Sequence, residues 1–135
     1  NPTFDMQLFN LNNYMSLSKN SPINTFSEKL DLISYSRGMG ALGLPGDFSS
    51  ASRFVKASYI KLNSICGKSE EESVSQFFHI LGTVEQIKGS VKLQNGMYEN
   101  TIYTSCCNTD KCIYYYTTYN NSSINAVDMY KENLN

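Results

Sequence analysis

Apolar residues recur at helical spacing in three parts of the chain, and the first of these repeats is the weakest. Asparagines stand between its apolar positions, which are Phe4, Leu8, Leu11 and Met15. This spacing predicts a short amphipathic helix over about residues 5–16. A second helix is expected to start from a serine cap at Ser49 or Ser50 and to run to about Asn63.

The third helix has the clearest start signal. Ser69 stands three residues before Glu72, which is the spacing of a capping box. The apolar face that follows consists of Val74, Phe77, Phe78, Leu81 and Val84. We expect this helix to continue until Gly89, because glycine readily adopts the left-handed conformation that ends a helix.

Beyond Gly89 the pattern changes from helical to extended. Strands are predicted at residues 90–93, 97–105, 112–119 and 124–129. The pair Asn95-Gly96 is a strong hairpin signal, and the β-branched and aromatic residues around it suit a half-buried pleated surface. An antiparallel sheet with two helices packed on one face predicts an α+β fold. Since the sequence has no internal repeat and no break in composition, we expect residues 1–135 to form a single domain.

Composition and charge exclude several classes of function. With 41% hydrophobic and 17% charged residues, the chain has the composition of a folded globular protein. Its formal net charge of -1 and its pI of about 5.8 provide no positive field for a phosphate backbone or an anionic membrane, so nucleic acid is not an expected partner. No apolar run approaches the roughly 20 residues of a membrane-crossing helix, so we expect a soluble chain and no membrane partner.

The cysteines are Cys66, Cys106, Cys107 and Cys112. A structural zinc site needs four ligands, and the chain has a single histidine, His79, so neither a metal nor a cofactor is expected. A domain of this length does not depend on two disulfides, and we expect free thiols in a reducing compartment. A disulfide from Cys106 or Cys107 to Cys112 across the predicted hairpin is the geometrically possible alternative.

Three further groups receive structural interpretations. His79 has no partner carboxylate or nucleophile nearby in the sequence, which favours a structural histidine over a general base. The run Tyr114-Tyr115-Tyr116 lacks the basic surroundings of a base-stacking platform, so we expect it to alternate between core and solvent along a strand. The acidic run Glu70-Glu71-Glu72 falls in the first turn of a helix, where it would complement the dipole as a solvated cap.

A glycine-rich segment before the second predicted helix is the most unusual local feature. Four glycines fall within nine positions, which predicts an irregular loop: Gly38, Gly40, Gly43 and Gly46. The spacing matches neither a P-loop nor a dinucleotide fingerprint. The loop leads into Arg53, whose charge at the positive end of a helix is unfavourable unless an anion or functional partner is present. A surface ion pair with Asp47 is the alternative interpretation.

Several blocks of sequence carry a resemblance to a known family. They are residues 1–5, 10–14, 43–48, 52–54, 77–81, 113–116 and 125–129. In order and spacing these blocks resemble the choloylglycine hydrolases, the family of bile salt hydrolases and penicillin V acylases, over essentially the whole chain. The resemblance is strongest to bile salt hydrolases of Gram-positive intestinal bacteria.

The resemblance implies that this chain is the C-terminal part of an N-terminal-nucleophile hydrolase with an αββα sandwich. In that family a Cys made N-terminal by processing attacks an amide, and its α-amino group activates the thiol. The family's nucleophile, one Arg, an Asp and an oxyanion-hole Asn would lie outside this sequence. Arg53 is the one catalytic residue carried over, and there a fixed cation would favour the thiolate. Departures from the family's usual residues are Lys56 for Arg, Cys112 for Gly and Met6 for an aromatic residue.

The function implied is hydrolysis of the C–N amide bond of glycine- or taurine-conjugated bile salts by a bacterial cytoplasmic enzyme. Its expected partners are the N-terminal part of the same enzyme and further copies of itself, as a tetramer. The isolated chain is expected to be inactive, and an apolar sheet face left uncovered would make it self-associate. The alternatives are penicillin V acylase, with the same chemistry on another amide, and a non-catalytic truncated domain.

Overall fold

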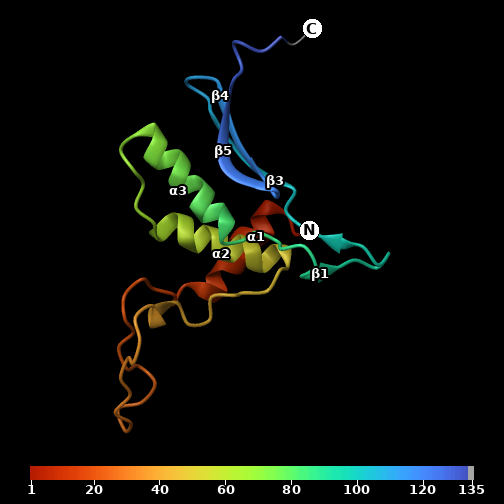
Figure 1. Cartoon of the computed structure of the whole chain (residues 1–135). Coiled ribbons are helices and arrows are strands. Elements are labelled where there is room, and N and C mark those ends of the chain that lie inside the picture. The colour runs from red at the N-terminus through yellow and green to blue at the C-terminus, as the bar shows by residue number, and fades with distance from the viewer. Residues whose placement is uncertain (134–135) are drawn as a thin grey trace. The chain divides into compact units, whose positions relative to one another are not determined.

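The computed structural model describes residues 1–133, which form two compact units. The first unit is Asn1–Asn63 and the second begins at Ser64. In Figure 1 the first unit is coloured from red to yellow, and the second from green to blue.

The first unit is built on two helices. Helix α1 spans Phe4–Asn10 and continues as a 3₁₀ turn, η1, over Leu11–Tyr14, whereas α2 spans Ser50–Asn63. Both predicted helices are confirmed, with the second half of the first one wound more tightly than expected. The rings of Phe4 and Phe54 meet edge to face at 6.0 Å, and Val55 is 1% exposed. These contacts hold α1 against α2.

The segment between these helices is almost entirely irregular, with one 3₁₀ turn, η2, at Met39–Ala41. Its two ends meet where the Ser18 N–H donates to the Gly40 carbonyl at 2.8 Å. A Cβ atom at Gly40 would overlap the carbonyl oxygens of Ser18 and Asn20 at the other end of the segment, so only glycine fits there. Large apolar side chains along the segment are more than three-quarters exposed: Ile23, Phe26, Ile33 and Tyr35.

The second unit begins with α3, Glu70–Gly82. The predicted capping box is present, because the Ser69 hydroxyl accepts from the Glu72 N–H and the Glu72 carboxylate accepts from the Ser69 N–H. The expected end at Gly89 is wrong. From Thr83 onward the backbone bonds shorten to the i→i−3 type, and the Thr83 hydroxyl takes the Ile80 carbonyl, which ends the helix seven residues earlier. Gly89, with φ of 95°, belongs to a later turn.

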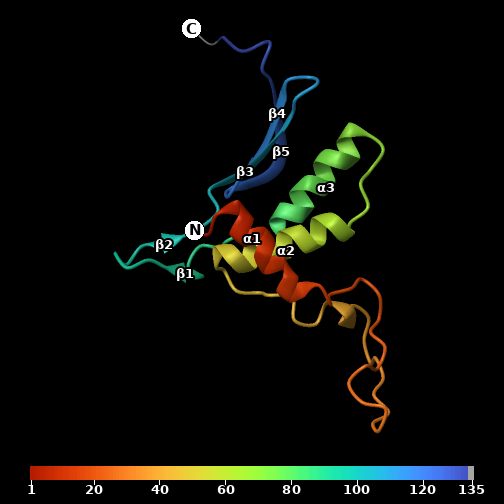
Figure 2. The ribbon, with the colours of Figure 1, turned by 180° about the vertical axis from the view of Figure 1, so that it is seen from behind.

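Two separate antiparallel sheets follow in place of one. Strands β1 (Val91–Lys92) and β2 (Tyr98–Glu99) form a hairpin around Gly96, where φ is 83° (Figure 2). The three-stranded sheet, in the order β3-β4-β5, consists of Tyr103–Asn108, Ile113–Thr118 and Asn121–Asp128. The pairing of β1 with β2 confirms the predicted hairpin at Asn95-Gly96.

The predicted strand over residues 97–105 is wrong as one element. Between β2 and β3 the chain bonds to the segment that follows α3. The Thr101 N–H donates to the Gln86 carbonyl at 3.0 Å, and the Thr101 hydroxyl accepts from the Gln86 N–H at the same distance. Because Thr101 pairs with Gln86 and not with a neighbouring strand, the expected strand is divided into two.

Helix α3 packs on the three-stranded sheet through β3 (Figure 1). The tyrosine run alternates between the two faces of the sheet, but the predicted division into core and solvent is wrong. Tyr115 faces α3, where its hydroxyl donates to Glu70, whereas the rings of Tyr114 and Tyr116 lie 6.2 Å apart on the other face. All three are only half-buried. The three α-helices and antiparallel sheets confirm the α+β class, while membership of one single domain stays a prediction.

Two observations concern residues singled out from the sequence. All four cysteines are unbonded thiols; Cys66 and Cys107 are exposed, whereas Cys106 and Cys112 are half-buried. Within residues 1–133, no helix has both the length and the hydropathy that crossing a membrane would require.

Candidate active site

The candidate site lies where the glycine-rich segment enters α2. Gly43 adopts a left-handed conformation, with φ of 96°, and Pro45-Gly46-Asp47 follows it. A tight turn here directs the chain into the first turn of α2. The expected serine cap is present, because the Ser49 hydroxyl accepts from the Ser52 N–H at 3.3 Å.

Asp47 ties this helix start together with both of its carboxylate oxygens. Oδ1 accepts from the Ser49 N–H at 2.9 Å, and Oδ2 accepts from the Ser52 hydroxyl at 2.5 Å. Hydrogen bonds from Ser49 and then Ser52 lower the pKa of Asp47 to about 2. Asp47 is therefore ionised at neutral pH and places a negative charge beside the positive end of α2.

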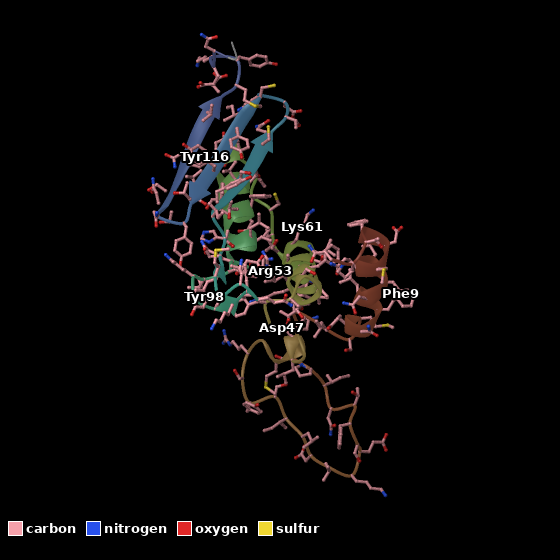
Figure 3. All side chains as sticks on the ribbon, turned by 90° about the vertical axis from the view of Figure 1, so that its right-hand side faces the viewer. Phe9, Asp47, Arg53, Lys61, Tyr98 and Tyr116 are labelled. Carbon is pink, nitrogen blue, oxygen red and sulfur yellow. The ribbon has the colours of Figure 1, made fainter. Side chains whose placement is uncertain are left out.

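Arg53 occupies the first full turn of α2 and is half-buried. Its N–H donates to the Ser49 carbonyl at 2.9 Å, which makes it the first residue whose backbone is bonded to the cap residue. Arg53 and Asp47 are both labelled in Figure 3. Successive helical residues are rotated by about 100°, so Arg53 leaves α2 on nearly the opposite side from the buried Val55. Arg53 is thus directed away from the face that packs on α1.

Packing holds the residues that follow Arg53. Phe54 contacts the ring of Phe4, and Val55 lines a small hollow together with Leu11, Tyr14 and Leu17. A half-turn of α2 is therefore fixed on its apolar side by α1 and η1, and at its start by the Asp47 cap. The backbone of Arg53 is held between these two constraints.

The structure brings none of the four thiols into the first unit, since the cysteines all follow Ser64. Burial, with a smaller contribution from Cys107, raises the pKa of the Cys106 thiol and disfavours the thiolate that a nucleophile needs. His79 is exposed on α3. These positions give no support for a nucleophile or general base among the described residues of either unit.

Sequence analysis missed one polar cluster, centred on Glu70. Its carboxylate accepts from the side chains of Asn108, Lys111 and Tyr115. These bonds, led by Lys111 and then Tyr115, lower the pKa of Glu70, and the same carboxylate raises the pKa of Tyr115. The interpretation of the acidic run as a solvated cap is therefore wrong for Glu70, which joins α3 to the β3–β4 hairpin. In the sequence, the one sign of this contact is a carboxylate at the position that directly follows the helix cap.

Comparison with known proteins covers the chain from end to end. Residues 1–135 match the family described as linear amide C–N hydrolases, choloylglycine hydrolase family. A bile salt hydrolase/transferase of Lactiplantibacillus plantarum is 63% identical over 99% of this chain, and one from Clostridium perfringens is 41% identical over 98%. The chain spans 41% and 40% of the lengths of these two relatives.

Solved structures agree with the sequence relatives. A crystal structure of a variant of the conjugated bile acid hydrolase from Clostridium perfringens has a TM-score of 0.84 and 41% identity, covering 99% of this chain and 41% of its own. A penicillin V acylase from Agrobacterium tumefaciens has a TM-score of 0.64 at 20% identity, over 97% of this chain and 35% of its own, which establishes a shared fold only. With the family match over every residue, these likenesses show that the chain belongs to the choloylglycine hydrolase family of linear amide C–N hydrolases.

Proposed function

We propose that the whole protein hydrolyses the amide bond of glycine- or taurine-conjugated bile salts, and that these residues are its C-terminal part. The observation that carries this proposal is the 63% identity to a bile salt hydrolase/transferase over 99% of the chain. Because this identity extends over nearly the whole chain, the substrate class named for the relative is the first to test.

In this proposal Arg53 is the catalytic residue that the chain contributes. Its half-buried position limits the screening of its charge by water. It leaves α2 on the side away from the face that packs on α1. A fixed cation beside a thiol stabilises the thiolate and the oxyanion that forms when the amide carbonyl is attacked.

The nucleophile itself is proposed to be an N-terminal cysteine in a part of the protein outside these residues. The thiolate forms a bond to the amide carbon, the C–N bond breaks, and glycine or taurine leaves with the proton it needs as an amine. Water then attacks the acyl-thioester and releases the bile acid and the thiol. The chain alone is expected to be inactive, because it contributes Arg53 without this nucleophile.

Other aspects of the whole protein are proposals of the same kind. A cytoplasmic location suits unbonded thiols at all four cysteines. Assembly into a homo-oligomer, with a tetramer as the form to test, suits the exposed apolar residues of the first unit. Penicillin V acylase activity has less support, since that likeness is 20% in identity and extends to the fold alone.

Arg53→Ala in the whole protein tests the proposal. We expect kcat/KM for glycocholate to fall about 100-fold, as when one charge-stabilising group is removed from an acyl-transfer site. The matched control is Arg37→Ala, which removes the other, exposed arginine and should leave turnover near wild type. The pH profile of thiol alkylation by iodoacetamide gives a second measurement, in which Arg53→Ala should raise the pKa of the nucleophile.

Turnover near wild type in Arg53→Ala would remove this residue from the mechanism. Faster hydrolysis of penicillin V than of glycocholate by the wild-type protein would instead change the substrate class. Intact mass of the native protein tests the remaining alternative, because 15.2 kDa alone would indicate a truncated domain without the nucleophile.

A further inference from the structure

The start of α2 contains a group that the proposed reaction does not use directly, the carboxylate of Asp47. We infer that Asp47 is a positioning residue for Arg53: it locks the first turn of α2 through Ser49 and Ser52, and thereby fixes where the guanidinium is presented. This inference rests on the proposed function only for its effect on activity, since the geometry concerns residues of the first unit alone.

The hydrogen bonds form a continuous path from Asp47 to Arg53. Oδ1 holds the Ser49 N–H at 2.9 Å, and the Ser49 carbonyl in turn accepts the Arg53 N–H at 2.9 Å. Oδ2 holds the hydroxyl of Ser52, the residue that directly precedes Arg53, at 2.5 Å. Asp47 therefore acts on the residue that accepts the Arg53 N–H and on the residue that precedes Arg53.

Charge gives a second reason for an aspartate at this position. A cation in the first turn of a helix is repelled by the positive end of the dipole. The carboxylate of Asp47 lies before the same turn and is ionised over the whole physiological range. It offsets this repulsion without the need for Arg53 to swing out into solvent.

The packing of α2 on α1 and η1 makes the position of Arg53 sensitive to a small change at Asp47. Phe54 and Val55 are held by α1 and η1, so the helix cannot rotate freely to compensate for a loosened start. Loss of the Asp47 bonds should fray the turn up to Ser52, so that the Arg53 backbone keeps the packing at Phe54 and Val55 but loses the cap that precedes it. The expected result is a displaced guanidinium on a folded protein.

A double-mutant cycle in the whole protein tests the inference. Asp47→Asn keeps the shape of the side chain and removes its charge and one acceptor. We expect kcat for glycocholate to fall about ten-fold with little change in KM, since a small misplacement of a catalytic group acts mainly on the transition state. In an Arg53→Ala background, the same substitution should cause no further loss, because its effect passes through Arg53.

The matched control is Asp5→Asn, which removes an aspartate from the first turn of the other helix of this unit. It should leave kcat unchanged in both backgrounds. Ser52→Ala removes the Oδ2 contact alone and should reproduce part of the Asp47→Asn loss, whereas Ser52→Thr, which keeps a hydroxyl, should restore it. Ser52→Ala and Ser52→Thr provide the test if Asp47→Asn lowers the yield of folded protein.

A crystal structure of Asp47→Asn gives a readout independent of activity, in which the Arg53 guanidinium should be displaced or disordered relative to wild type. Losses that add in the cycle, or an Arg53 that stays in place, would overturn the inference and leave the proposed function intact. If Arg53→Ala retains activity while Asp47→Asn still displaces the guanidinium, positioning is supported and the catalytic role of Arg53 fails.

Discussion

Cys112 occupies a backbone conformation that most side chains avoid. Its φ is 53°, and it is the one non-glycine residue with positive φ in the described part of the chain. It stands between the turn after β3 and the start of β4, and its Sγ lies 3.2 Å from the Tyr130 hydroxyl and 3.7 Å from the Thr109 carbonyl. A left-handed residue with a Cβ costs about 1–2 kcal/mol, which these weak sulfur contacts offset only partly.

We expect Cys112→Gly to raise the free energy of unfolding by about 0.5–1 kcal/mol. Relief of the left-handed strain exceeds the entropy that glycine adds to the unfolded chain, about 0.4–1 kcal/mol. Urea denaturation of the whole protein measures the change. Cys112→Asn is the informative companion, because asparagine tolerates this conformation, whereas Cys112→Val should destabilise. An unchanged or lower midpoint for Cys112→Gly would show that the sulfur contacts outweigh the strain.

At the scale of elements, Glu70 connects the first turn of α3 to a hairpin about forty residues later in the chain. It binds Asn108 at the end of β3, Lys111 in the β3–β4 turn and Tyr115 within β4. Its neighbour Glu71 is exposed. One carboxylate thus supplies polar contacts that hold the helix start and the hairpin together.

Glu70→Gln should loosen this connection, because the amide cannot replace the ion pair with Lys111. We expect amide hydrogen exchange in β3 and β4 to become faster by several-fold, with Glu71→Gln as the matched control that leaves it unchanged. Tyr115→Phe should give a smaller effect in the same amides. Equal protection in Glu70→Gln and wild type would show that apolar packing alone holds α3 on the sheet.

The pKa shifts of this cluster predict a pH range for the connection. The folded pKa of Glu70 is lowered, so its contribution is present above the unfolded pKa and is lost as pH falls through the folded value. The folded pKa of Tyr115 is raised, so its contribution is present below the unfolded pKa and is lost as pH rises through the folded value. The exchange difference between Glu70→Gln and wild type should therefore shrink in strong acid.

At the scale of the whole molecule, the described chain has little interior of its own. Val55 is its one buried hydrophobic residue. On the sheet face turned away from α3, Tyr103 is 61% exposed and Tyr114 and Tyr116 are half-buried around an open hollow.

Expressed alone, these residues should therefore self-associate through this face and through the exposed segment that precedes α2. Sedimentation velocity over a range of concentrations measures this, and we expect the apparent mass to rise well above 15.2 kDa. Tyr114→Lys with Tyr116→Lys should reduce the association. A single compact monomer at all concentrations would contradict the prediction.

Local signals explain which parts of this fold could be predicted from the sequence. The Ser69 capping box and the Asn95-Gly96 turn depend on neighbouring residues, and both are present as expected. The break between β2 and β3 depends on Thr101 meeting Gln86, and the role of Glu70 depends on residues up to 45 positions away. No periodicity encodes such pairings. The sequence draws attention to Arg53 at a helix start, but its catalytic role follows only from resemblance to a family, since the same position also suits a surface arginine.

The contact between Ser18 and Gly40 has a consequence for how this protein could be re-engineered. Because the chain enters and leaves the intervening segment at one point, residues 19–39 form an insertion whose length is independent of the helices that flank it. Replacing this segment by a short turn at that junction should leave the register of α2 and the direction of Arg53 unchanged. The segment can therefore be exchanged between relatives or replaced by a tag while the flanking helices are kept.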